Sequence, residues 1–134
     1  MKKFNTLFKI LIISLTFVFV SCEIDSFAEE DQFSFGDITA PTNVQISASI
    51  AGTSSDNPNG DGSGEVSFSG SADNAITYKF VYNGEETVSP DGKITYTFAK
   101  LGLNTYTVTI IAVGKGGTTS SEAINVDVLV TYTP

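Results

Sequence analysis

Residues 105–114 read TYTVTIIAVG, and this stretch decides the fold class of the chain. Tyr106, Val108, Ile110 and Ala112 occupy every second position, and Thr fills most of the positions before and between them. A period of two places alternate side chains on opposite faces of a β-strand. Thr suits the exposed face of such a strand. The stretch is therefore predicted to be a strand with one buried face.

The same alternation recurs in five further stretches, at residues 43–50, 65–71, 76–83, 93–99 and 123–132. In residues 76–83 the predicted inward set is Ile76, Tyr78, Phe80 and Tyr82. Turn-forming runs separate the stretches, namely NPNGDGSG, SADNA, NGEE, SPDG, KLG and GKGG. Six or seven short strands, with no helix after residue 41, predict an all-β fold. We expect residues 41–134 to form an immunoglobulin-like antiparallel β-sandwich.

The N-terminus has the pattern of a secretory signal peptide. Lys2 and Lys3 precede an apolar run over residues 10–20, which is too short to span a membrane as a helix. The run ends in FVSC, which resembles the lipobox of bacterial lipoproteins. The resemblance implies cleavage after residue 21 and lipidation of Cys22, and two or three acyl chains would anchor the protein stably in a membrane.

Residues 22–40 are predicted to be an acidic tether that starts at the lipidated Cys22. Five acids lie between positions 23 and 31, and no strand or helix period holds for long. Repulsion between like charges extends such a chain, and eighteen flexible residues span roughly 23 Å root-mean-square. A plain solvated linker is one interpretation. The other is a resemblance to the export signal that directs Bacteroidetes lipoproteins to the outer face of the outer membrane.

Charge and composition exclude several classes of function. The net charge is −8, three of the seven lysines lie in the first nine residues, and the chain contains no Arg or His. A nucleic-acid partner is excluded because it requires clustered basic groups. Catalytic pairs of Ser or Cys with His cannot form, and zinc lacks its usual ligands. No catalytic residue is therefore predicted, and solvated turns are the expected positions of Asp73, Glu85, Glu86 and Asp91.

Residues 94–118, ITYTFAKLGLNTYTVTIIAVGKGGT, resemble the second half of a PKD domain, an immunoglobulin-like module of extracellular proteins. Six positions match the pattern of that family: Tyr96, Phe98, Gly102, Tyr106, Val108 and Ile110. The aromatic pair Tyr78 and Phe80 matches the start of the motif in its first half. Asn83-Gly84 replaces the Gly-Asp-Gly turn of the family, so no role of that turn is carried over.

The chain further resembles the PKD-like module that follows the lipidated cysteine in Bacteroidetes surface proteins of polysaccharide utilisation. This resemblance implies a non-catalytic spacer that presents glycan-capture machinery at the cell surface. The expected partners are the membrane, through Cys22, and polysaccharide or other glycan-utilisation proteins. Two alternatives stay open: a module that binds carbohydrate directly, and the N-terminal fragment of a larger glycoside hydrolase.

Two groups of residues are candidate binding sites. Alternating oxygen ligands in DNPNGDGSGE, residues 56–65, resemble the start of a calcium loop, with Asn57, Asn59, Asp61 and Glu65 as candidate ligands. The same residues suit tight turns, and the twelfth position of the loop is Phe68 instead of a bidentate acid. Tyr82, Tyr96 and Tyr132 are candidate glycan-stacking platforms, and packing between strands is the alternative.

Overall fold

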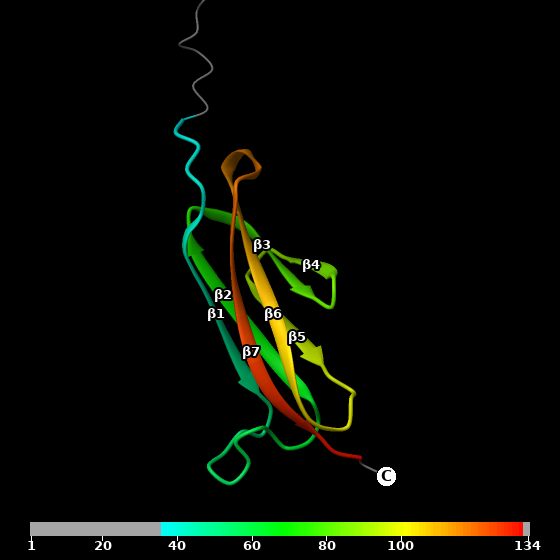
Figure 1. Ribbon diagram of the computed structural model, residues 1–134. Helices are drawn as coiled ribbons and strands as arrows, with labels where there is room; N and C mark the ends of the chain where they lie inside the picture. Colours follow the sequence, from blue (N-terminus) through cyan, green and yellow to red (C-terminus); the bar gives the residue numbers. More distant parts are fainter. Residues whose placement is uncertain (1–35, 133–134) are drawn as a thin grey trace, which may run out of the picture. The chain divides into compact units, whose positions relative to one another are not determined.

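The computed structural model describes residues 36–132 (Figure 1). The strands in this part of the chain are β1 (Thr42–Ile50), β2 (Glu65–Asp73), β3 (Ala75–Tyr82), β4 (Glu85–Ser89), β5 (Lys93–Thr97), β6 (Gly102–Gly114) and β7 (Thr119–Val130), and a short 3-10 turn, η2 (Lys115–Gly117), joins the last two. The predicted signal peptide, Cys22 and the tether up to residue 35 lie outside the described residues. Within residues 36–132, no helix has the length and apolarity needed to span a membrane.

The strands form two antiparallel sheets that pack face to face. Sheet A has the order β1-β2-β5, and sheet B has the order β4-β3-β6-β7. Every paired strand in the two sheets is antiparallel to its neighbour. The predicted immunoglobulin-like sandwich is therefore confirmed.

The core lies between the two sheets and consists of the side chains that the alternation predicts to point inward. Its buried members are Val66, Phe68, Phe80, Phe98, Tyr106, Val108, Ile110, Ala112, Val126, Val128 and Val130. Burying a side chain of this size contributes about 1.5–3 kcal/mol. The inward residues of the edge strand β1 are only half-buried, although they pack against this core.

Strand β4 is absent from the strands that the sequence predicts. Asn83 and Gly84 both adopt positive φ, at 52° and 81°. Two such residues form the tight turn that pairs neighbouring strands in a hairpin. Residues 85–89 therefore pair with β3, which places Glu85 and Glu86 in a strand instead of the expected turn. Asp73 ends β2, and Asp91 does lie in a turn.

Ile76 does not point into the core, contrary to the prediction. The register between β3 and β6 shifts between Ala75 and Thr77. This irregularity has the form of a β-bulge, in which an extra residue locally breaks the alternation. Ile76 is consequently 63% exposed, whereas Phe80 on the same strand is fully buried.

Strand β6 begins at Gly102, earlier than predicted. The Asn104 side-chain amide lies 3.0 Å from the carbonyl oxygen of Lys100 and 3.2 Å from those of Leu101 and Gly102. These contacts hold the loop between β5 and β6 tightly against the start of β6. Gly102 of the predicted KLG turn therefore belongs to the strand, and β6 reaches thirteen residues.

The chain reaches the sandwich at one end and leaves it at the other (Figure 1). At the first end, the Ser120 hydroxyl donates a hydrogen bond to the Pro41 carbonyl oxygen, at 2.6 Å. At the far end, the Thr131 N–H donates to the Gly62 carbonyl oxygen, at 2.9 Å. The long strands β6 and β7 run between these two ends.

Candidate functional site

The loop over residues 51–64, which contains most of the predicted calcium ligands, covers the last residues of β7. Leu129 donates its N–H to the carbonyl oxygen of Asn59, at 3.0 Å, and Thr131 donates to Gly62. The carbonyl oxygen of Asn57 accepts hydrogen bonds from Ser54 and Gly60. The main-chain oxygens of Asn57 and Asn59 are thus already used within the protein.

Asp61 forms a small turn of its own at the end of this loop. Its carboxylate accepts a hydrogen bond from the Ser63 N–H at 2.9 Å, and hydrogen bonds from the Ser63 hydroxyl and N–H lower the pKa of Asp61. Glu65 begins β2, where its N–H lies 3.3 Å from the Ser63 hydroxyl. No three Asp, Glu, Cys or His side chains of residues 36–132 gather into a group that could hold a metal ion. Calcium binding by this loop stays a prediction.

Tyr82 and Tyr96, two predicted glycan platforms, lie in an aromatic cluster between the sheets. Their ring centroids are 5.6 Å apart, and Tyr82 also contacts Phe98 at 5.2 Å. Phe98 in turn stacks on Tyr106 at 3.8 Å. Edge-to-face and stacked contacts of this kind stabilise a core. The half-buried Tyr82 and Tyr96 rings are therefore largely occupied by inter-sheet packing.

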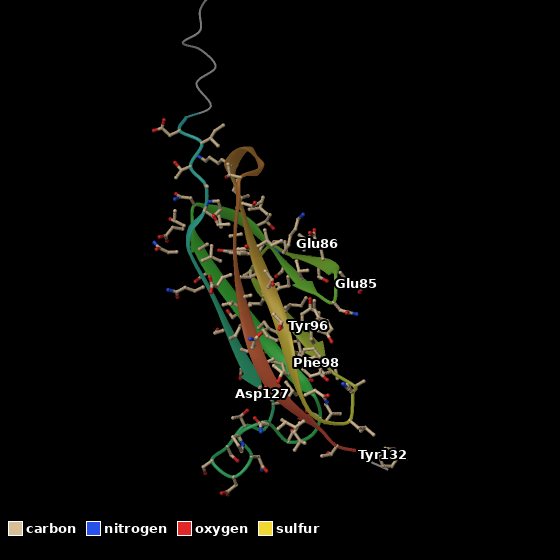
Figure 2. The ribbon with its side chains drawn as sticks, viewed as in Figure 1. Glu85, Glu86, Tyr96, Phe98, Asp127 and Tyr132 are labelled. Atoms are coloured by element: carbon tan, nitrogen blue, oxygen red, sulfur yellow. The ribbon has the colours of Figure 1, made fainter. Side chains whose placement is uncertain are left out.

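Tyr132, the third predicted platform, lies beyond the end of β7 and is 76% exposed. Figure 2 shows Tyr96 and Phe98 close together and Tyr132 well away from both. The structure therefore brings two of the three tyrosines together but does not build a three-ring binding surface.

Tyr106 contributes a polar feature that the sequence does not predict. The ring occupies a predicted core position, but its buried hydroxyl has no hydrogen-bond partner in the described residues. Burial raises the pKa of Tyr106, and the neighbouring Tyr82 phenol adds to the shift. Such a group is rare in folded proteins because an unpaired buried hydroxyl costs free energy. No pattern in the sequence signals this, since alternation predicts only that the ring is buried.

A polar groove of about 460 Å³ runs over the outer face of sheet A. The outward side chains that line it are Ser47, Ser49, Ser67, Ser69, Lys93 and Thr95. The Ser67 and Thr95 hydroxyls lie 3.1 Å apart and share a hydrogen bond. This surface offers hydroxyl donors and acceptors and one ammonium group. It is suited to hydrogen bonding with a neutral polar ligand and lacks an aromatic stacking platform.

From the sequence, these Ser and Thr positions are predicted only to form an exposed strand face. The sequence signal that could have indicated the groove is the repetition of small side chains at alternate positions on β1, β2 and β5. The register that aligns Ser47 with Ser69, and Ser67 with Thr95, is what turns the three strands into one groove. Sequence alone does not specify that alignment.

Comparison with solved structures identifies the architecture. The PKD1 domain of Vibrio anguillarum Epp matches with a TM-score of 0.50 and 17% identity, over 71% of this chain and 100% of that chain. The fold is PKD-like. The PKD1 domain of the Vibrio cholerae metalloprotease PrtV also matches, with a TM-score of 0.50 and 15% identity, over 69% of this chain and 100% of that one.

A third solved structure, from a study of the promiscuous specificity of carbohydrate-binding modules of the β-sandwich superfamily, matches with a TM-score of 0.53 and 20% identity. The match covers 72% of this chain and 37% of that chain. No family model and no curated protein sequence matches the chain. Likeness at these identities shows the fold alone.

Proposed function

We propose that the chain is a lipoprotein of the outer cell surface, anchored in the outer membrane through Cys22. Its PKD-like sandwich acts as a non-catalytic spacer that presents glycan-capture machinery away from the membrane. The observation that carries this proposal is the position of the two chain ends at opposite ends of the sandwich (Figure 1). A domain that the chain enters at one end and leaves at the other adds its full length to the distance between the segments on either side of it.

The length that the sandwich adds is set by β6. Thirteen residues at a strand rise of about 3.3 Å span roughly 40 Å. Strand β7 pairs with β6 along nearly all of this length, from Gly102–Val130 to Val113–Thr119. A flexible chain of the same length would not hold a fixed separation, whereas a paired and packed sandwich does.

The chain is also fixed where it joins the sandwich. Ile38 lies over the hairpin between β6 and β7, and a Cβ atom on Gly116 would come within 3.2 Å of its side chain. Ser120 holds Pro41 through the hydrogen bond described above. These contacts make the start of the domain a defined support for the predicted acidic tether.

The spacer is tested by measuring heights above a membrane. Dyes attached to Ile38→Cys and to Tyr132→Cys in the acylated full chain are compared by energy transfer to a lipid dye in liposomes. We expect the dye at position 132 to lie farther out, by roughly the 40 Å span of β6. Equal heights would contradict the spacer. The Cys22→Ser variant is the control for anchoring, and its retention in the membrane fraction would contradict the lipoprotein assignment.

Direct carbohydrate binding is the second candidate function. It is favoured by the polar groove on sheet A and by the likeness to a carbohydrate-binding β-sandwich. The test is affinity electrophoresis through soluble α-glucans and β-glucans, with calcium and with chelator. Retardation that is lost in Ser67→Val/Thr95→Val, but kept in the sheet B control Thr107→Val/Ser121→Val, would place binding in the groove. If the wild-type protein is not retarded by any glucan, direct carbohydrate binding is contradicted and only the spacer role stays proposed. If retardation is lost with chelator, the loop over residues 51–64 takes part in binding through calcium.

A further inference from the structure

Sheet B lacks a strand beside the first half of β6. The pairing of β3 with β6 ends at Val81 and Thr109, because β3 stops at Tyr82 and turns into β4. Strand β6, however, begins seven residues earlier, at Gly102. Over residues 102–107, β6 therefore pairs with β7 on one side and has no neighbouring strand on the other. We call this stretch the open β6 edge.

The direction of the backbone groups follows from the hydrogen bonds of β6. Gly114 donates its N–H to the carbonyl oxygen of Thr118. The even-numbered residues of β6 therefore direct their backbone N–H and C=O groups toward β7. In an antiparallel strand, alternate residues direct their N–H and C=O groups to opposite sides. Leu103, Thr105 and Thr107 consequently direct theirs toward the missing strand. In the described residues, the β3–β6 pairing ends at Thr109 and no loop supplies these groups with a backbone partner on that side.

The Thr105 and Thr107 side chains do not cover the open β6 edge. Thr105 donates its hydroxyl to the Asp127 carboxylate at 2.5 Å, and Thr107 donates to the Asn125 side chain at 2.7 Å. Both partners lie on β7, so these hydroxyls are directed away from the open side. Figure 2 shows Asp127 beside β7.

Strand β4, strand β5 and the end of β7 carry protection that the open β6 edge lacks. Charged residues and Pro on or beside an edge strand, and loops that cover it, prevent unwanted pairing. Strand β4 is short, contains two Glu residues and is followed by Pro90. On β5, the Ser89 hydroxyl accepts from the Lys93 N–H at 2.9 Å and lies 2.7 Å from its carbonyl oxygen. The end of β7 is covered by the 51–64 loop.

By contrast, residues 101–109, LGLNTYTVT, contain no charge and no Pro. Leu101 and Leu103 are each 60% exposed at one end of the open β6 edge. The strand itself contributes no charge there and is partly apolar. A partner that suits it is accordingly uncharged, with apolar or β-branched side chains.

Tyr106 connects this edge to the core. A strand added beside β6 would place one inward side chain next to that of Tyr106, because directly opposite Cβ atoms lie about 4.5–5.5 Å apart. The Tyr106 hydroxyl is buried without a partner in the described residues, and Tyr106 is 9% exposed. An inward polar group of the added strand, or a water that it traps, would supply the missing hydrogen bond.

We propose that the open β6 edge is a strand-addition site that binds an extended, uncharged segment of another polypeptide. The segment would extend sheet B through the N–H and C=O groups of Leu103, Thr105 and Thr107, and its alternate side chains would contact Leu103 and Tyr106. Recognition through main-chain hydrogen bonds is a known mode of peptide binding at sheet edges. The site is separate from the polar groove and does not depend on the spacer role.

The test uses the full chain in detergent and a fluorescein-labelled Thr-Val-Thr-Val-Thr peptide. We expect the fluorescence anisotropy of the peptide to rise at protein concentrations up to about 1 mM, the weak end of specific binding. Amide NMR shifts should be largest at Leu103, Thr105 and Thr107. The Thr105→Pro variant removes an outward N–H without breaking the β6–β7 ladder, so it should weaken binding by roughly tenfold or more.

Two controls separate loss of the edge from loss of the fold. Thr95→Pro makes the same change on the free side of β5 and should leave binding unchanged. A peptide with methylated alternate amides cannot donate to the edge, and it should not bind the unaltered protein. Absence of binding to the wild type, or its loss in Thr95→Pro instead of Thr105→Pro, would overturn the proposal. Self-association of the chain that Thr105→Pro abolishes would also overturn it, because the occupant would then be a second copy.

Discussion

At the scale of single residues, the effect of a substitution depends on the surroundings of the residue as well as on the residue type. Tyr106 and Tyr82 are both predicted core tyrosines, yet only the Tyr106 hydroxyl is fully buried without a partner. Gly64 and Gly84 both have positive φ, at 75° and 81°, but they lie in different surroundings. In each pair, the same substitution at the two residues can be compared by its effect on stability.

Removing the Tyr106 hydroxyl should stabilise the protein. We expect Tyr106→Phe to raise the free energy of unfolding by about 1 kcal/mol, because an unpaired buried polar group is removed while the ring is retained. The measurement is thermal unfolding followed by circular dichroism, where this change corresponds to an increase in Tm of about 4–8 °C. Tyr82→Phe is the control and should have little effect. A lower Tm for Tyr106→Phe would show that a water or ligand satisfies the hydroxyl.

Substituting Gly64 should be much more damaging than substituting Gly84. A Cβ atom on Gly64 would clash with the carbonyl oxygen of Phe98, whereas one on Gly84 would meet nothing within 4 Å. Gly84→Ala therefore incurs only backbone strain, about 1–2 kcal/mol. Gly64→Ala also displaces the Phe98–Gly64 hydrogen bond, so we expect a loss above about 3 kcal/mol in urea unfolding. Equal losses would mean that the contact between β2 and β5 relaxes easily.

At the scale of elements, the turns carry the titratable groups that affect stability. Ser89 is buried, and its hydroxyl lies 2.9 Å from the Asp91 carboxylate in the turn that links β4 of sheet B to β5 of sheet A. Hydrogen bonds from the Ser89 hydroxyl and then from the Lys93 N–H lower the pKa of Asp91 below its usual value of 3.8. A similar arrangement at Ser63 lowers the pKa of Asp61.

Both turns should therefore weaken in acid. A carboxyl group whose pKa is lower in the folded protein stabilises it above the unfolded pKa, near 3.8 here, and this contribution is lost as pH falls through the folded pKa. Both carboxylates are solvent-exposed, so the effect is small. The measurement is urea unfolding between about pH 5 and about pH 2. Asp91→Asn should be less sensitive to acid than the wild type, and an unchanged pH profile would contradict this role.

At the scale of the whole molecule, the two sheets share one core and should unfold together. Phe68 of β2 and Phe80 of β3 are both fully buried and belong to the same cluster. We expect Phe68→Ala and Phe80→Ala each to lower the free energy of unfolding by about 3–5 kcal/mol. Amide hydrogen exchange should then accelerate in both sheets for either variant. Acceleration confined to the sheet that carries the substitution would show that the sheets unfold separately.

The sequence by itself determined the fold class and most of the strands. Alternation of apolar and polar residues is a local property, and it correctly assigns the buried faces of β2, β5, β6 and β7. It fails for Ile76, because a bulge shifts the register, and for β4, because EETVS has no alternating pattern and forms a strand only through its pairing with β3. Both failures arise where a neighbouring strand, and not the local sequence, fixes the conformation.

Only the tertiary structure decided the surfaces on which function is proposed. The Ser and Thr residues of three strands become one groove because of their register, and Tyr82 and Tyr96 become partners in packing because the two sheets face each other. The open β6 edge exists because β3 ends before β6 does, a difference in length between strands that lie far apart in sequence. Such features depend on long-range pairing, which hydrophobic periodicity along one strand does not encode.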